Sequence, residues 1–417
     1  MSVVLGIDFG TSNSACCCLD DQGHPKPQNI KGEEVNVPSI VVLDEAATYW
    51  GKAAELVISD QARQAVQSRN FKDFRNLLPK VFREFKRRLG SRRMTWKLAG
   101  GRVVRPVDLV ASFIRHLLDG GGLMDGKKAI SSLCLTHPVG FNSEQLLDLR
   151  EALYRNGFCR EIKLLPEPVA AAMGYEAKHG WLAQKKGIVV FDFGGGTLDV
   201  AYLMRDSSGK LVARSENCKG QKLQLGENIG GADIDMLIYS IAAKRIGRDP
   251  DAPIDPDLKM KCKKIKEGLS LRDQCQEMVF QTKVTKKNGV AVETTQEVPF
   301  SITRDEFMNA LKRDVRILPG LKRTLKSVLD AVKEDRQLPP VDCLLPIGGS
   351  CRMPAVQELL NQMKPQEAKM GELFTDDIAV AMGASIEAGR HAPVEQLARM
   401  KRELEQWVKG VVAATGC

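Results

Sequence analysis

The sequence has 417 residues and a net charge of +9, with 43% hydrophobic and 27% charged residues. This composition excludes a disordered or low-complexity chain and is typical of a globular protein large enough for two or three domains. The sequence shows no charge-free apolar run that could cross a bilayer and no secretory leader pattern at its start. We therefore expect a cytoplasmic protein with no membrane partner.

The chain opens with a predicted β-hairpin. Apolar residues 3–8 form a strand that ends at Asp8, a glycine-containing turn follows, and residues 14–19 form the second strand. The rest of the first half is predicted as a strand at 39–43, a basic helical region at 61–90, an amphipathic helix at 108–119, a strand at 129–136 and a helix at 143–156.

Residues 61–105 carry a local excess of positive charge, with 14 Lys and Arg residues against Asp73 and Glu84. Such a patch can attract nucleic acid or an acidic protein. No nucleic-acid recognition motif or interleaved aromatic side chains accompany it in the sequence. We interpret the patch as a solvated basic face and do not expect nucleic acid as a partner.

The opening pattern returns in the middle of the chain. Residues 187–194 form an apolar strand that ends in Asp-Phe-Gly, as residues 4–10 do, and Asp192 lies 184 residues after Asp8. A duplication at this distance predicts two related α/β halves rather than a short-period solenoid. We assign residues 1–186 to the first lobe, 187–393 to the second lobe and 394–417 to a C-terminal helix.

The second half alternates between long helical and strand patterns. Its predicted elements are a helical region at 236–272, strands at 277–301, a helical region at 303–334, a strand at 344–347, a helix from 354 and an amphipathic helix at 394–414.

The two Asp-Phe-Gly segments carry the chemistry of the sequence. An Asp at the carboxyl end of a strand can point into a cleft and hold a hydrated Mg²⁺. Glycines beside it let backbone N–H groups approach phosphate oxygens without a Cβ in the way. A single segment of this kind could also be a glycine-rich hairpin with a capping Asp. The symmetric pair, with turns at 10–13 and 194–197, predicts a clamp on a polyphosphate.

Three further segments fit a nucleotide cleft. Glu167 and Pro168 open a helix of small residues, and residues 378–384 have a similar composition. Small residues let two helices cross closely, which suits a hinge, although each segment alone could be a core helix. Residues 348–354 follow a strand and offer Arg352 to a base or ribose, although an ordinary strand–helix turn has the same pattern.

Together these motifs resemble the ATPase domain of the heat-shock protein 70 family. The resemblance spans residues 3–390 and rests on segments at 6–14, 165–172, 191–199, 229–235, 348–354 and 377–384. It implies an actin-like (ribonuclease H-like) α/β fold of two lobes around a nucleotide cleft, with ATP or ADP and Mg²⁺ as cofactors.

The resemblance also implies roles for single residues. Glu167 orients or deprotonates the attacking water, and the catalytic lysine corresponds to Lys86, with Arg75 as the alternative. The residues that resemble the Mg²⁺ and catalytic phosphate site are Asp8, Asp192, Thr197 and Asp199. The residues that resemble the phosphate-binding segments are Gly10, Thr11, Ser12, Asn13, Gly194, Gly195, Gly196, Thr197, Gly230 and Gly231. Those that resemble the nucleoside pocket are Lys266, Ser270, Gly348, Gly349, Ser350, Arg352 and Asp377.

Two positions depart from the family pattern. Lys263 stands where the family has an acidic residue near the nucleoside, and Leu146 replaces an arginine used in interdomain signalling. A predicted helix at 394–414 also takes the place of a hydrophobic linker and a substrate-binding domain. We therefore expect a short variant without that domain.

The function expected from these motifs is a slow Mg-ATP hydrolase. Its lobes close with nucleotide state and control a client protein or a co-chaperone-like partner, and we expect a monomer. Three alternatives stay open: a non-catalytic ATP-sensing interaction module, a small-molecule kinase of the same superfamily, and a filament-forming relative.

Overall fold

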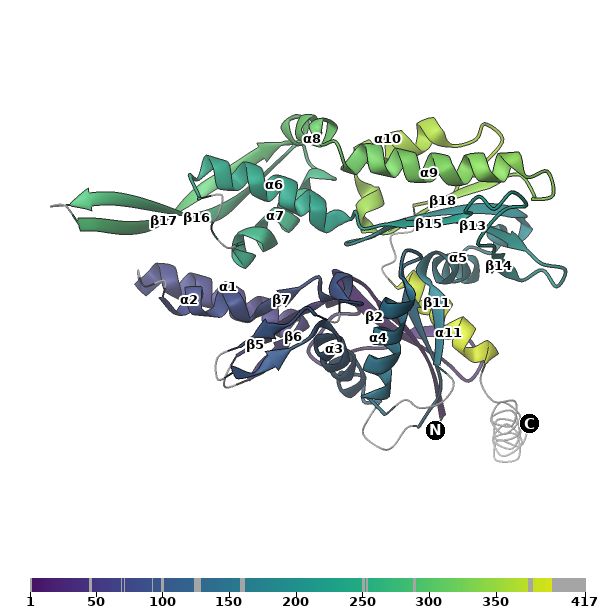
Figure 1. The fold of residues 1–417 in the computed structure, drawn as a ribbon, viewed down its shortest axis with the longest axis horizontal. Coiled ribbons are helices and arrows are strands. Elements are labelled where there is room, and N and C mark those ends of the chain that lie inside the picture. The colour runs from purple at the N-terminus through teal and green to yellow at the C-terminus, as the bar shows by residue number, and fades with distance from the viewer. Residues whose placement is uncertain are drawn as a thin grey trace, which may run out of the picture.

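The computed structural model describes residues 2–391 (Figure 1), with gaps at 45, 46, 69, 71, 92, 99, 100, 124–128, 158–161, 250, 251, 253, 288, 289 and 374–377. The predicted helix at 394–414 lies outside this range. Figure 1 shows the first half of the chain, in purple and blue, below the second half, in teal and green. No helix within the described ranges is long and apolar enough to cross a membrane.

The first half is built on a sheet with the strand order β11-β10-β1-β2-β3, in which β4 also pairs with β2. Strand β1 is parallel to β10 and antiparallel to β2, and Asp8 lies opposite Ala15 near the end of this hairpin. Leu5, Ile7 and Phe9 alternate on the face that packs against α3 and α4. The strands are β1 Ser2–Phe9, β2 Asn13–Leu19, β3 Pro25–Pro27, β4 Val37–Pro38, β10 Ala129–His137 and β11 Ile162–Pro166, and the helices are α3 Pro106–Gly120 and α4 Ser143–Tyr154.

The second half repeats this plan with the order β14-β13-β12-β18-β19, in which β15 also pairs with β13. Strand β12 is antiparallel to β13 and parallel to β18, as β1 is to β2 and β10. The strands are β12 Gly187–Phe193, β13 Leu198–Arg205, β14 Leu211–Ala213, β15 Gln224–Glu227, β18 Cys343–Ile347 and β19 Lys369–Met370. The helices around this sheet are α6 Gly231–Arg245, α7 Pro256–Leu269, α8 Arg304–Arg313, α9 Ile317–Glu334 and α10 Pro354–Met363.

Helices α5 (Glu167–Lys178) and α11 (Ala379–Arg390) cross between the two sheets (Figure 1). They touch through glycines: a Cβ on Gly174 would lie 2.0 Å from the carbonyl oxygen of Ala379, and one on Gly383 would lie 1.8 Å from that of Ala170. Helix α5 packs under the second sheet and α11 under the first. The close crossing expected of these two small-residue helices is therefore present, and each half supplies a helix to the other.

The outer part of each half flanks the space between the lobes. In the first half, α1 and α2 pack beside a sheet with the order β6-β5-β7, and in the second half a long hairpin, β16–β17, packs beside α7. These elements are α1 Gly51–Ser68, α2 Lys72–Leu77, β5 Ile40–Leu43, β6 Thr48–Trp50, β7 Val81–Arg83, β16 Gln274–Lys287 and β17 Val290–Thr303. A small hairpin in the first half pairs β8 Trp96–Lys97 with β9 Val103–Val104.

The helical interpretation of residues 61–90 is correct only in part. The chain leaves the helical conformation at β7, because Val81, Phe82 and Arg83 pair with β5 and Phe82 enters the core. This pairing with a strand forty residues away overrides the local helical pattern. A short 3₁₀ helix, η2 (Phe85–Arg88), follows and carries Lys86.

Candidate functional site

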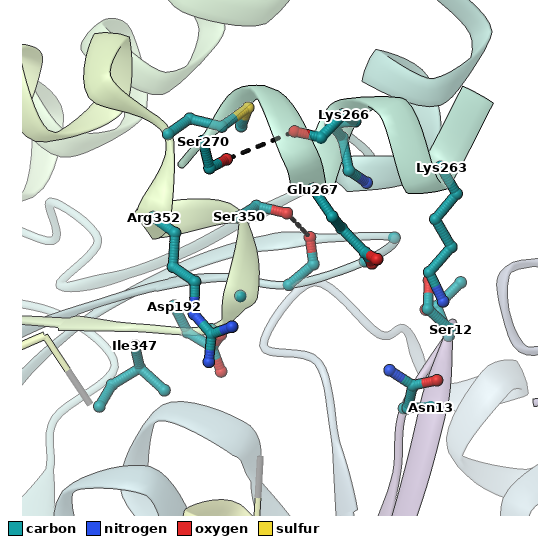
Figure 2. Close-up of a pocket in the computed structure, with 18 of the residues that line it drawn as sticks. Ser12, Asn13, Asp192, Lys263, Lys266, Glu267, Ser270, Ile347, Ser350 and Arg352 are labelled. Atoms are coloured by element: carbon teal, nitrogen blue, oxygen red, sulfur yellow. Dashed lines mark hydrogen bonds between the residues drawn. The ribbon is translucent and has the colours of Figure 1, made fainter. Parts of the chain in front are cut away.

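A cavity of about 590 Å³ lies between the two halves. Both hairpin turns, the start of α5, the end of α7 and the turn between β18 and α10 form its wall, and Figure 2 shows side chains from several of these segments pointing into it. The predicted site residues that line the cavity are Asp8, Gly10, Thr11, Ser12, Asn13, Glu167, Asp192, Gly194, Gly195, Gly196, Thr197, Lys266, Ser270, Gly348, Gly349, Ser350 and Arg352.

The two hairpin turns meet directly at the base of this cavity. A Cβ on Gly195 would lie 2.1 Å from the Oγ of Ser12, and a Cβ on Gly196 would lie 2.4 Å from the Oγ1 of Thr11. At these two positions, only glycine fits without displacing the side chain of Ser12 or Thr11. The turns therefore place bare backbone from one half against hydroxyl groups from the other, an arrangement suited to oxyanions such as phosphate.

Negative charge accumulates beside the turns. Asp192 and Asp199 are opposite each other on β12 and β13, and both are buried. Burial raises the pKa of Asp192 well above its usual range, and the nearby carboxylates of Glu167, Asp199 and Asp8 raise it further. Burial, followed by the charge of Glu167, raises the pKa of Asp199 to about 7. The folded site is therefore more stable when a cation balances these groups.

Asp199 also has an unused acceptor. Its Oδ1 accepts a hydrogen bond from the backbone N–H of Val139 at 2.6 Å, whereas its buried Oδ2 has no partner among the described residues. A buried carboxylate oxygen without a donor is unfavourable unless water or an ion reaches it.

Lys86 and Glu167 form a buried ion pair at the edge of the cavity. The Nζ of Lys86 donates to the Oε1 of Glu167 at 2.5 Å, and Lys86 is only 2% exposed. Its ammonium also lies 5.5 Å from the ring centroid of Phe9 and 5.9 Å from that of Phe141. Lys86 thus stands behind Glu167 rather than in the cavity wall. Nothing is described for the side chain of the alternative, Arg75.

The part of the cavity where the sequence predicts a nucleoside pocket is formed by α7 and the turn after β18. Lys266 pairs with Asp235 at 2.8 Å and donates to the carbonyl oxygen of Gly231 at 3.0 Å, so its position is fixed. The Oγ of Ser350 donates to the carbonyl oxygen of Gly194 at 2.9 Å, which ties this turn to the second hairpin turn. In Figure 2, Arg352 extends from the turn after β18 on the side of the cavity away from Lys263.

Four predicted residues lie outside the cavity wall. Lys86 and Asp199 are buried behind the residues that line the cavity. Gly230 and Gly231 begin α6 and support the second turn: the N–H of Gly231 donates to the carbonyl oxygen of Gly194 at 3.0 Å, and a Cβ on Gly230 would lie 2.5 Å from the nitrogen of Gly196. Asp377 is outside the described residues.

The sequence analysis missed charged residues at the cavity mouth. Glu267, Lys264 and Arg272 all line the wall, and none was identified as a site residue. Glu267 could have been found by helical spacing, because it lies four residues after Lys263 and next to Lys266 on the same helix. Figure 2 shows Lys263 extending from α7 toward Ser12.

The donor set fits a hydrated cation rather than a directly ligated one. Within the described ranges, no three His, Cys, Asp or Glu side chains converge closely enough to bind a metal directly. The unpartnered oxygen of Asp199 and the raised pKa of Asp192 nevertheless favour positive charge at this position. Mg²⁺ keeps several of its waters in proteins and commonly takes phosphate oxygens as ligands, so these carboxylates fit it through its waters.

Known proteins match this chain over most of its length. A family profile described as Hsp70 protein matches residues 4–401. The chain is 28% identical over 398 residues to the chaperone protein DnaK of Mycoplasmoides gallisepticum, a match that covers 93% of this chain and 60% of the relative. It is 26% identical over 411 residues to the chaperone protein DnaK of Thermus thermophilus, covering 93% of this chain and 61% of that protein. The chain thus spans about three fifths of the length of these curated relatives.

Proposed function

This chain belongs to the Hsp70 family, and from that premise we propose that it binds ATP between its two lobes and hydrolyses it. Membership confirms the predicted actin-like α/β fold of two related lobes. We further propose that lobe closure around the nucleotide controls a client protein or a co-chaperone-like partner, and that the protein is a cytoplasmic monomer. The chaperone names of its relatives support the partner class.

The observation that carries the hydrolase proposal is the buried pair of Lys86 and Glu167 beside the two phosphate turns. The carboxylate of Glu167 accepts a proton from a water molecule as that water attacks the γ-phosphorus of ATP. The bond from this phosphorus to the bridging oxygen of the β-phosphate breaks, which leaves ADP and inorganic phosphate. Lys86 orients Glu167, and its charge offsets the negative charge that develops on the phosphoryl oxygens.

Mg²⁺ would be held through its waters by Asp8, Asp192 and Asp199, and it supplies charge neutralisation at the phosphates. The chain's own hydroxyl and N–H groups, from Thr11, Ser12 and Gly195–Thr197, orient the triphosphate between the turns. Lys266, Ser270 and Arg352 are proposed to contact the nucleoside. The ammonium of Lys266 is already fixed by Asp235, so binding needs little further ordering of this side chain.

Single-turnover hydrolysis of ATP with Mg²⁺ tests the proposal, with Asp192→Asn as the comparison. We expect slow hydrolysis by the wild-type chain and a loss of at least about a hundredfold in the variant, as removal of a group that stabilises developing charge commonly causes. Calorimetry measures ATP binding in both proteins. Hydrolysis at the same rate in the variant would disprove the assignment of the cavity.

Lys263 favours the second candidate, a non-catalytic ATP-sensing module, because it adds a cation that extends from α7 toward Ser12. In this position, the charge of Lys263 could keep the lobes closed on a bound triphosphate without hydrolysis. Tight ATP binding by the wild-type chain with no phosphate release would support this function. Transfer of phosphate to a sugar or acid would instead indicate a kinase.

A further inference from the structure

A second group of charged residues joins the two lobes outside the cavity. Glu84 and Arg87 belong to the first lobe, and they contact Lys259 on α7 and Asp233 on α6 of the second lobe. The Nζ of Lys259 donates to the carboxylate of Glu84, and Arg87 lies 3.4 Å from both Glu84 and Asp233. All four side chains are between 15% and 22% exposed, so solvent only partly screens these charges. We call these four residues the cross-lobe network.

Two residues of the cross-lobe network, Glu84 and Arg87, flank the proposed catalytic lysine in the sequence. Glu84 precedes η2, Lys86 is its second residue and Arg87 follows directly. While Glu84 and Arg87 face the other lobe, Phe85 and Lys86 are buried at 1% and 2% exposure. The contacts on either side of Lys86 therefore set the position of the turn from which it reaches Glu167.

The backbone of Glu84 shows that this turn is held under constraint. Glu84 has φ 55° and ψ 24°, and it is the only non-glycine residue in the described part of the chain with a positive φ. L residues other than Asn and Asp seldom adopt this left-handed conformation, which persists only where surrounding contacts enforce it. The charge of Lys259 supplies such a contact: burial alone would raise the pKa of Glu84, but Lys259 and Arg87 lower it overall.

On the other lobe, the network ends at the second phosphate turn. The Oδ2 of Asp233 accepts a hydrogen bond from the N–H of Gly230 at 2.9 Å and so caps α6. The next residue of this helix start, Gly231, donates its N–H to the carbonyl oxygen of Gly194. The same Oδ2 of Asp233 also accepts a hydrogen bond from the Nη1 of Arg87. The Nη2 of Arg87 donates to the carbonyl oxygen of Asn228 at 2.8 Å.

We propose that Glu84, Arg87, Lys259 and Asp233 are positioning residues that place Lys86 against Glu167 only when the lobes are together. Separation of the lobes breaks the pairs of Glu84 with Lys259 and of Arg87 with Asp233. The strained turn then relaxes, and Lys86 leaves its buried position. Assembly of the catalytic pair is thereby coupled to closure of the lobes. The catalytic consequence rests on the proposed hydrolase function, whereas the placement of Lys86 does not.

The test uses Lys259→Met in the full chain, with Lys261→Met as the matched control. Lys261 lies on the same helix and pairs with Asp257 at 2.7 Å, but both of these residues belong to α7. Acylation of the lysine amines with an N-hydroxysuccinimide ester, followed by mass spectrometry, reports the exposure of Lys86, with Lys266 as the internal reference. We expect Lys86 to react about tenfold faster in Lys259→Met, the effect of losing a half-buried ion pair, and at the wild-type rate in Lys261→Met.

Further variants separate positioning from a loss of folding. Lys259→Arg keeps the charge and should restore slow labelling of Lys86, while Glu84→Gln should accelerate it as Lys259→Met does. Faster labelling of Lys86 and Lys266 together would indicate general loosening of the fold and would overturn the proposal. So would equal labelling of Lys86 in Lys259→Met and Lys261→Met.

Single-turnover hydrolysis supplies the second readout. Lys259→Met should lower the rate of hydrolysis about tenfold, with a smaller change in the affinity for ADP, because the lost contact acts on Lys86 rather than on the cavity wall. An unchanged rate in Lys259→Met would contradict the catalytic part of the proposal. If the wild-type chain hydrolyses no ATP, the hydrolase proposal fails, and the labelling of Lys86 still decides whether the network positions this residue.

Discussion

Asp199→Asn should stabilise the nucleotide-free, metal-free protein at high pH and not at low pH. The side chain is 1% exposed, and burial and Glu167 raise its pKa to about 7, against an ordinary value of 3.8. Because the pKa of Asp199 is higher in the folded state than in the unfolded state, Asp199 is protonated in the folded state and ionised in the unfolded state at pH values between the two pKa values. The wild-type free energy of unfolding therefore falls as the pH rises from about 4 to about 7. Asparagine keeps an oxygen acceptor for the N–H of Val139 and removes the titration.

The size of this effect follows from the pKa difference. Roughly three pKa units correspond to a loss of about 4 kcal/mol from the unfolding free energy of the wild type, and the full loss is reached only above pH ~7. Urea denaturation in EDTA at pH ~4 and pH ~8 measures it, with Asp330→Asn, an exposed carboxylate on α9, as the control. The variant should match the wild type at the lower pH and exceed it by a few kcal/mol at the higher pH. An equal difference at both pH values would refute the reasoning, because it would show that Asp199 does not titrate differently in the folded state.

Two further predictions concern the catalytic pair and the helix crossing. Glu167→Gln should lower single-turnover hydrolysis by ~10²–10⁴-fold with ATP binding retained, since the amide cannot accept the proton of water. Phosphate release measures hydrolysis, and calorimetry measures ATP binding. Hydrolysis by the variant at the wild-type rate would exclude Glu167 as the base. Gly174→Ala should destabilise the fold by about 1–3 kcal/mol in urea denaturation, because the new Cβ would lie 2.0 Å from the carbonyl oxygen of Ala379. Gly180→Ala, which meets nothing within 4 Å, is its control, and equal effects would argue against the close crossing.

The duplicated architecture and most of the cavity wall could be predicted from the sequence, because the signals that carry them are local. A strand that ends in Asp-Phe-Gly, followed by a turn of small residues, can be recognised from neighbouring residues alone, and its occurrence at both Asp8 and Asp192 predicts the clamp. The cavity indeed contains both turns and Glu167. The charged residues of the mouth, such as Glu267, were missed because they lie on an ordinary amphipathic helix face.

What the tertiary structure decided depends on residues that are distant in the sequence. The region around Lys86 has a helical and basic pattern, yet β7 pairs with β5 there, and Lys86 becomes buried against Glu167, 81 residues later. The contact of Glu84 with Lys259 spans 175 residues and joins the two lobes. Local patterns constrain φ, ψ and hydrophobic faces within a few residues, whereas burial and ion pairing are set by which surfaces meet. The sequence by itself therefore predicted the two hairpin turns and the repeat, and only the tertiary packing of distant segments decided which lysine meets Glu167.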